Sequence, residues 1–164
     1  MLNIYQVFRH NHLKEKRTLL FAQKVSFGLL LLSCTAHSQQ QTFKEGVMHI
    51  GNNTIQVMIA DTLATRQRGL MHVEHLPKDS GMWFQFDDLR HQCMWMKNTP
   101  IHLDVAFINR DLKIINIEAM QAHTETRHCS QKPAAFALEM NQGWFKSKHI
   151  TAGSLIEKPQ TPFR

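Results

Sequence analysis

Residues 94–109 read MWMKNTPIHLDVAFIN and contain two apolar runs on either side of a turn signal. In residues 94–97 methionine alternates with tryptophan and lysine, and in residues 103–109 leucine, valine and phenylalanine lie opposite Asp104. Because successive side chains of a strand point to opposite faces, each run predicts a strand with one apolar face. The Asn-Thr-Pro sequence between the runs is typical of a turn.

Strand-length apolar runs recur along the rest of the chain. Residues 47–60 alternate around Gly51-Asn52-Asn53, which predicts a hairpin. Further strands are expected at residues 82–86, 112–117, 135–140 and 154–157. Asp61 or Thr62 can cap a short helix that runs through Arg68, before Gly69, and one or two helical turns are expected within residues 142–149. Several short strands with close turns predict a mainly β, single-domain antiparallel sandwich or barrel with one or two short helices.

The first 38 residues predict an export signal. A basic stretch that ends at Lys24 precedes the apolar residues 25–32, which are too few to span a bilayer. Leu31-Leu32-Ser33-Cys34 resembles a lipobox, which makes Cys34 a lipidation candidate, whereas Ala36-His37-Ser38 resembles an ordinary cleavage site. Both processing routes stay open, and the protein is expected to be periplasmic or lipid-anchored at the cell envelope.

Charge and composition bound the remainder of the chain. We divide it into a polar tether at 39–46, a mainly β domain at 47–158 and a C-terminal tail at 159–164. The net charge is +6, but residues 1–24 hold five basic side chains against one acidic. The small remaining charge does not indicate nucleic acid as a partner. Membrane contact is expected only through the signal or a lipid anchor.

Five segments carry a resemblance to a known family. They are RGLM at 68–71, GMWFQF at 81–86, MWMKNTPIHLDVAFIN at 94–109, KIINIEAM at 113–120 and PAAFALEMNQGWF at 133–145. In this order they resemble the bacterial and archaeal family known as domain of unknown function 192, over about residues 47–157. The resemblance implies a compact, mainly β domain that is often exported, and it implies no established activity. Pro100-Ile101-His102 departs from the family, which more often has an apolar-Pro pair there.

Cys93 and Cys129 are the thiols that remain after signal removal. An exported protein occupies an oxidising compartment, so we expect these cysteines to form a disulfide, worth about 4 kcal/mol on the chain-entropy model. One alternative is a pair of reduced, buried cysteines. The other is a copper or zinc site built from His91, Cys93, Met94, His128 and Cys129, although no tight Cys-x-x-Cys or His-x-x-x-His spacing supports it.

Strand alternation also suggests a ligand site. It places Trp95, Lys97, Asp104 and Glu139 opposite the apolar positions of their strands, where they could share one surface. An aromatic platform with one cation and two carboxylates fits a small-ligand site. The alternative interpretation is an ordinary solvated sheet face.

Catalysis has weaker support. Two carboxylates suggest a glycosidase, and Lys97 beside Asp104 suggests a lysine base. Neither Ser130 nor Ser154 has a nucleophile-elbow setting, and no Gly-rich phosphate loop occurs. We therefore assign no catalytic residue and no cofactor. We expect an exported binding or accessory protein whose partner is an unknown small molecule or envelope protein, with an envelope hydrolase and a copper or zinc carrier as alternatives.

Overall fold

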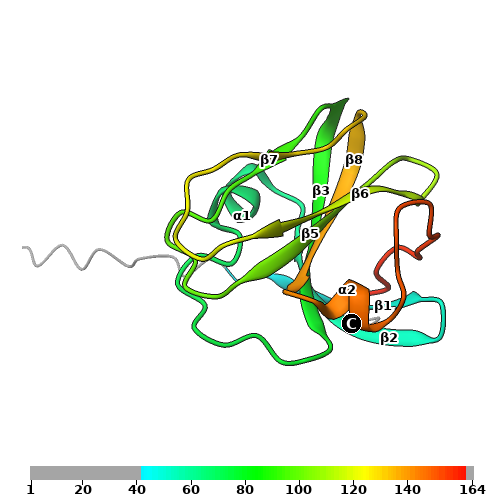
Figure 1. The fold of residues 1–164 in the computed structure, drawn as a ribbon, viewed down its shortest axis with the longest axis horizontal. Helices are drawn as coiled ribbons and strands as arrows, with labels where there is room; N and C mark the ends of the chain where they lie inside the picture. Colours follow the sequence, from blue (N-terminus) through cyan, green and yellow to red (C-terminus); the bar gives the residue numbers. More distant parts are fainter. Residues whose placement is uncertain (1–41, 162–164) are drawn as a thin grey trace, which may run out of the picture. The chain divides into compact units, whose positions relative to one another are not determined.

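The computed structural model describes residues 42–161, which Figure 1 shows as a coloured ribbon. The predicted export signal at 1–38, the lipidation candidate Cys34, and residues 39–41 and 162–164 lie outside the described residues. Within the described part, no helix is long and apolar enough to cross a membrane.

Six strands form one mixed sheet in the order β1-β2-β3-β8-β5-β6, and β4 pairs with β7 in a second sheet. The elements are β1 Lys44–Ile50, β2 Asn53–Ala60, α1 Leu63–Arg68, β3 Ser80–Arg90, β4 Cys93–Met94, β5 Leu103–Ile108, β6 Ile114–Met120, β7 His128–Cys129, β8 Ala134–Asn141 and α2 Trp144–Ser147. Neighbouring strands are antiparallel except β2 and β3. The fold is therefore mainly β with two short helices, as expected, and its main sheet is mixed and does not close into a barrel.

The hairpin of β1 and β2 forms where the sequence predicts it. Gly51 adopts φ +55°, a left-handed conformation that glycine reaches without a steric penalty. Ile50 then pairs with Asn53 across the turn. Because β1 begins at Lys44, the sheet reaches into the segment that we predicted as a tether.

Helix α1 is capped by Thr62, one of the two predicted caps, and it ends at Arg68 as predicted. The Thr62 hydroxyl accepts a hydrogen bond from the Thr65 N–H at 3.2 Å, and the Thr65 hydroxyl accepts one from the Thr62 N–H at 3.0 Å. This reciprocal pair satisfies amide groups that a helix start leaves open. Gly69, with φ +47°, ends the helix. Since parallel strands need a crossover connection, α1 and residues 69–79 form the link from β2 to β3.

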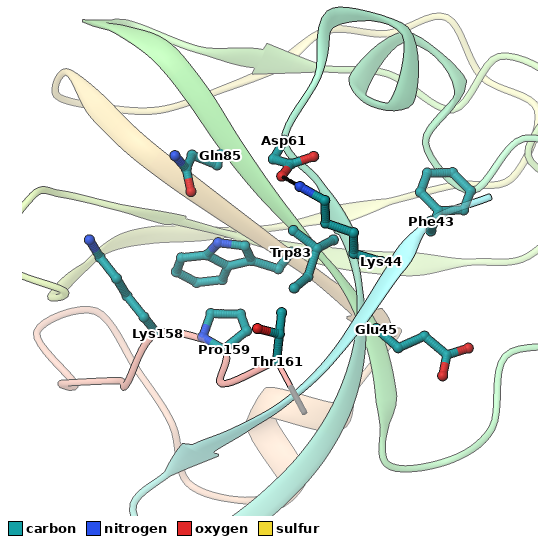
Figure 2. Close-up of a pocket in the computed structure, with 10 residues that line it drawn as sticks. Phe43, Lys44, Glu45, Asp61, Trp83, Gln85, Lys158, Pro159 and Thr161 are labelled. Atoms are coloured by element: carbon teal, nitrogen blue, oxygen red, sulfur yellow. Dashed lines mark hydrogen bonds and ion pairs between the residues drawn. The ribbon is translucent and has the colours of Figure 1, made fainter. Parts of the chain in front are cut away.

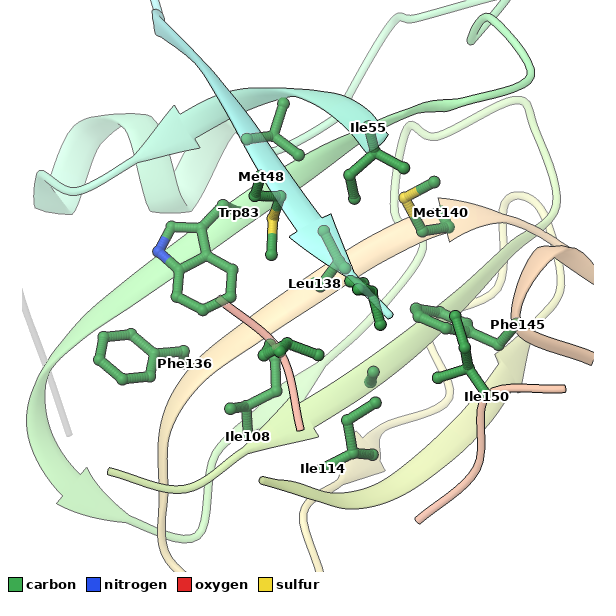
Figure 3. Packing of buried hydrophobic residues seen from close by; sticks show 14 of the residues in the cluster. Met48, Ile55, Trp83, Ile108, Ile114, Phe136, Leu138, Met140, Phe145 and Ile150 are labelled. Carbon is green, nitrogen blue, oxygen red and sulfur yellow. The ribbon is translucent and has the colours of Figure 1, made fainter. Parts of the chain in front are cut away.

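Side chains on both faces of the main sheet are buried. On β8, Leu138 and Met140 point to one face, which we call the Leu138 face. Their apolar cluster includes Trp83 and Phe145, as Figure 3 shows. Glu139 alternates with them and points to the other face, which we call the Glu139 face. The apolar residues on that face are Met82, Phe84, Val105 and Phe107, and Leu70, Leu76 and Met96 pack against them.

Among the described residues, one predicted strand is cut short and another is reduced to an isolated bridge. The strand expected at 94–97 ends at Met94, because the chain turns at Lys97-Asn98 and Asn98 adopts φ +57°. The Met96 N–H donates to the Thr124 carbonyl at 2.9 Å instead of continuing a strand ladder. The strand expected at 154–157 is reduced to one isolated bridge between Leu155 and Lys113. In both places apolar residues predicted strands, but no neighbouring strand extends the pairing.

Candidate ligand-binding cavity

A cavity of about 350 Å³ lies on the Glu139 face of the sheet. Its walls come from residues 66–71, from Phe84 of β3, from residues 93–95, and from Thr99 and Glu139. The crossover connection and the segment around β4 thus cover the centre of the sheet from outside. The cavity is in the size range of pockets that hold small molecules.

Glu139 is the polar group at the base of this cavity. It lies between Met82 of β3 and Val105 of β5 in the sheet register, and the residue is 4% exposed. None of the described residues donates a hydrogen bond to its carboxyl group or pairs with it. Every fully buried side-chain nitrogen and oxygen of the described residues has a hydrogen-bond partner. It follows that the unpaired Glu139 oxygens face the cavity.

Burial controls the protonation of Glu139. Removal from water disfavours the charged carboxylate and raises the pKa of Glu139 from 4.5 to about 8. At pH 7 the side chain is therefore mainly a neutral carboxylic acid. A neutral acid carries an O–H donor, whereas a carboxylate only accepts hydrogen bonds.

Two arginines of α1 stand at the wall of the cavity. The Arg66 guanidinium donates to the carbonyl oxygens of Asp61 at 3.1 Å and Gln85 at 2.9 Å, and it pairs with the Asp87 carboxylate. The Arg68 guanidinium lies 5.1 Å from the centre of the Phe43 ring. Both guanidinium groups line the wall, and the charge of Arg66 is balanced by Asp87.

Trp95 and Lys97 lie together at the surface beside the cavity. Trp95 lines the cavity and is nevertheless 46% exposed. The Lys97 ammonium lies 5.4 Å from the centre of the Trp95 ring and 3.7 Å from a carboxylate oxygen of Glu125. The alternation of residues 94–97 placed both methionines on an apolar face. Met96 is buried, at 1% exposed, whereas Met94 is half-buried and lines the cavity.

Asp104 belongs to a different place. In the register of β5 and β8, Asp104 pairs with Met140, and it lines a separate cavity with Asn116 and Phe145. Its carboxylate accepts a hydrogen bond from the Gly143 N–H at 2.8 Å. Burial raises the pKa of Asp104, and this hydrogen bond partly opposes the shift. The prediction that all four candidates share one surface is therefore wrong, because Asp104 faces away from Glu139.

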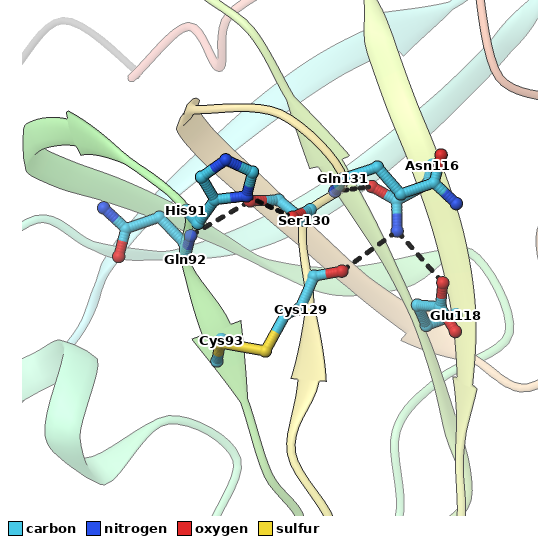
Figure 4. Close-up of a disulfide and its surroundings, with 8 residues drawn as sticks. All are labelled: His91, Gln92, Cys93, Asn116, Glu118, Cys129, Ser130 and Gln131. Atoms are coloured by element: carbon cyan, nitrogen blue, oxygen red, sulfur yellow. Dashed lines mark hydrogen bonds between the residues drawn. A yellow bond between two sulfur atoms is a disulfide. The ribbon is translucent and has the colours of Figure 1, made fainter.

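Cys93 and Cys129 form a disulfide, with their Cα atoms 4.0 Å apart. The two residues lie directly opposite each other in the β4-β7 pair, as Figure 4 shows. The predicted pairing is confirmed. Both thiols are consumed in this bond, and the described residues contain no group of three His, Cys, Asp or Glu side chains able to hold a metal ion. The alternative copper or zinc site at His91, Cys93, Met94, His128 and Cys129 is therefore not assembled.

A larger hollow of about 840 Å³ lies elsewhere in the described chain. Figure 2 shows the Trp83 indole between Lys158 and the ion pair of Lys44 with Asp61. That ion pair closes at 2.6 Å, and Lys158 lies 5.1 Å from the centre of the Phe136 ring. Lys44, Asp61 and Lys158 are thus engaged with one another or with a ring, and Glu45 at the same hollow is exposed. This hollow shows no buried acid comparable to Glu139.

Sequence reasoning missed most of the cavity wall. Phe84, Leu70, Met71 and the two arginines come from segments that the tertiary fold brings together with β4 and β8. The apolar alternation in GMWFQF places Phe84 on a strand but does not say which partner it meets. The RGLM segment follows a recognisable helix end, which was the available signal that its side chains turn back over the sheet.

The sequence of this chain matches a known protein family. A sequence profile of DUF192, described as an uncharacterised ACR, matches residues 46–158. Among curated proteins, none matches this chain.

Two crystal structures resemble this fold. One, a candidate transcription regulator from Sinorhizobium meliloti 1021, is 31% identical with a TM-score of 0.66, over 72% of this chain and 96% of that chain. The other, a protein of unknown function from Novosphingobium aromaticivorans DSM 12444, is 28% identical with a TM-score of 0.65, over 69% of this chain and 84% of that chain.

Proposed function

We propose that this chain, which belongs to the DUF192 family, is a binding or accessory protein that holds a small, mainly apolar ligand in the Glu139 cavity. The observation that carries the proposal is the buried Glu139 carboxyl, which faces the cavity without a partner among the described residues. A buried acid in this state lowers stability at neutral pH. Such a cost is typical of functional sites and not of simple packing.

The protonation of Glu139 selects the chemistry of the ligand. Near pH 7 the acid donates its proton in a hydrogen bond, so the matching ligand group is a carbonyl or another neutral acceptor. A cationic ligand group would have to approach past Arg66 and Arg68. The two features together favour an uncharged acceptor at the inner end of the ligand.

The other wall residues supply apolar contact. Leu70, Met71, Phe84, Met94 and Trp95 line the space above Glu139. Apolar surface that leaves water contributes about 25 cal/mol per Å². A ligand with a short apolar body and one acceptor therefore fits the cavity better than a sugar or a nucleotide.

We propose that the protein acts at the cell envelope after export. The basic and apolar order of residues 1–38 supports this location, and the Cys93–Cys129 disulfide suits an oxidising compartment. The proposed partner is a small molecule or an envelope protein, and not nucleic acid. Because Asp104 and Glu139 lie on opposite faces, they cannot flank one scissile bond, and we therefore favour binding over hydrolysis.

Two probes of similar shape test the ligand chemistry. Hexanamide carries a neutral acceptor and hexylamine carries a cation, and amide NMR signals of residues 69–71 with the Trp95 indole N–H report occupancy. We expect hexanamide to bind at pH 7 and to weaken about tenfold per pH unit above 8, as Glu139 loses its proton. Glu139→Met should weaken hexanamide binding, and Glu139→Gln should remove its pH dependence.

Asp104→Asn is the matched control, since it changes the buried acid of the other face. It should leave hexanamide binding unchanged. Tighter binding of hexylamine, signal changes confined to other parts of the molecule, or an unaltered pH dependence in Glu139→Gln would each contradict the proposal.

A further inference from the structure

We propose that the Cys93–Cys129 disulfide is chemically reactive and exchanges with a dithiol, with Glu139 as the proton donor to Cys93. The inference shares Glu139 with the proposed ligand site but does not require a bound ligand. The basis is the position of the disulfide, which lies between the solvent and the Glu139 cavity. Cys129 is exposed, whereas Cys93 is half-buried and lines the cavity.

The difference in access decides which sulfur is attacked. An incoming thiolate must approach a disulfide sulfur directly, so the accessible sulfur reacts first. The exposed residue is Cys129, at the end of the two-residue strand β7. Cys93 is then the leaving group, and its sulfur departs on the side of the cavity.

The cavity supplies the proton that this leaving group needs. A thiolate released beside apolar walls is poorly solvated, so protonation stabilises it. The titratable side chains that line the cavity are Glu139 from β8 and Arg66 and Arg68 from α1, and only Glu139 can give up a proton near neutral pH. Glu139 and Cys93 line the same cavity, which places the acid on the side where the Cys93 sulfur leaves.

The atoms and electrons balance through two steps. A thiolate of the dithiol attacks the Cys129 sulfur, the Cys93–Cys129 bond breaks, and Cys93 leaves and takes the Glu139 proton. The second thiol of the dithiol loses its proton to solvent and attacks the first dithiol sulfur in the mixed disulfide, which releases Cys129 as a thiolate. The dithiol loses two electrons and becomes a disulfide, while Cys93 and Cys129 gain two electrons. In the reverse direction the Glu139 carboxylate accepts the Cys93 proton and activates that thiol.

Burial tunes Glu139 for this transfer. With its pKa raised to about 8, the acid keeps its proton at pH 7 and can donate it to a thiolate, whose ordinary pKa of about 8.5 is raised further by apolar surroundings. An acid with an unshifted pKa would already be ionised at pH 7 and could not donate.

The backbone around the cysteines is held by bonds that do not depend on the disulfide. The Ser130 N–H donates to the Gln92 carbonyl at 2.8 Å, and the Gln92 N–H donates to the Ser130 hydroxyl at 3.0 Å. The Asn116 side-chain amide donates to the Cys129 carbonyl at 3.2 Å. Figure 4 shows these residues next to the sulfur bridge. After reduction the two thiols thus stay opposite each other, so the bond can form again.

The experiment is the reduction of the folded protein by dithiothreitol, followed by alkylation and mass measurement over pH 6 to 9. We expect reduction to be faster than global unfolding under the same conditions. Glu139→Gln cannot donate a proton as an acid and should slow reduction at pH 7 by about tenfold. This is less than general acids usually give, because a thiolate already leaves readily.

Asp104→Asn again serves as the matched control and should be reduced at the rate of the unchanged protein. Glu139→Asp retains an acid and should recover part of the rate, which also covers the case in which Glu139→Gln folds poorly. Reduction no faster than global unfolding, or equal rates for the unchanged protein and Glu139→Gln across the pH range, would overturn the inference. Because hexanamide binding is read by NMR without any reductant, either proposal can fail while the other stands.

Discussion

The two faces of the main sheet each bury one carboxyl group, and they use it differently. On the Leu138 face, Asp104 accepts a hydrogen bond from the Gly143 N–H, next to the start of α2. On the Glu139 face, the acid has no such partner among the described residues and faces a cavity. Burial raises the pKa of both groups. Burial alone therefore does not distinguish these two acids, whereas the bonding partner does.

The largest expected effect is the pH dependence of the difference in stability between the unchanged protein and Glu139→Gln. The folded-state pKa of Glu139 is raised from 4.5 to about 8, so the folded protein retains a proton that the unfolded chain has lost. The contribution of this group to stability is complete below pH 4.5 and is lost as the pH rises to 8. The unchanged protein should lose about 5 kcal/mol relative to the variant across this window.

Urea unfolding of both proteins at several pH values measures that difference, because the other titrating groups cancel. Asp104→Asn gives the contrast between the faces, and its pH dependence should be smaller because a hydrogen bond opposes the effect of burial. A flat difference between the unchanged protein and Glu139→Gln would mean that Glu139 is ionised in the folded protein.

The next largest effect is the loss of stability when Met96, which packs against the Glu139 face, is truncated. Met96 is 1% exposed although it lies outside any strand, and Met48 of β1 is fully buried against the Leu138 face. Met96→Ala and Met48→Ala should each cost about 2 to 5 kcal/mol of unfolding free energy through the space left behind. Thermal and urea unfolding provide the measurement. A cost well below 1 kcal/mol for Met96→Ala alone would show that the cover of the cavity is not anchored by this side chain.

A smaller effect is expected from the bond made by Asp104. Asp104→Ala removes the acceptor of the Gly143 N–H and should cost about 1 kcal/mol. Asp104→Asn keeps an acceptor oxygen and should cost less. Urea unfolding at pH 7 compares the two variants. If both variants are more stable than the unchanged protein, as we expect for Glu139→Gln, the contrast between the two faces is wrong.

The smallest effect is expected at Lys97. Its ion pair with Glu125 and its contact with the Trp95 ring are both at the surface, where such interactions contribute little. Lys97→Ala should therefore change the unfolding free energy by less than about 0.5 kcal/mol. It should still alter the fluorescence of Trp95, which makes a spectrum the more sensitive measurement. A large loss of stability would mean that the contacts of Lys97 with Glu125 and Trp95 hold the segment beside the cavity in place.

Local sequence signals predicted the parts of this fold that depend on neighbouring residues. The glycine turn at Gly51, the Thr62 cap and the alternation of Leu103, Val105 and Phe107 each act within a few residues, and the structure contains all three. Cysteine chemistry predicted a contact between residues far apart in sequence, because few thiols were available to pair.

The candidate site was predicted only in part. Alternation correctly placed Glu139 opposite Leu138, and Trp95 does line the same cavity as Glu139. It did not show that β5 pairs with β8 in a register that turns Asp104 to the other face. Strand registry depends on tertiary pairing, which the two-residue period leaves undetermined. For the same reason the sequence did not identify the parallel contact of β2 with β3.

That parallel contact has a consequence for how the protein can be changed. Because β2 and β3 run in the same direction, the chain must return along the sheet, and the returning segment contains α1 and residues 69–71 of the cavity wall. Between its two ends, this segment is held to the sheet by the buried side chains of Leu70 and Leu76 and by the bond from Arg66 to the Gln85 carbonyl. The remaining wall positions of the segment could therefore be changed together while these anchors and the strands are kept, which offers a route to altering the selectivity of the proposed ligand site.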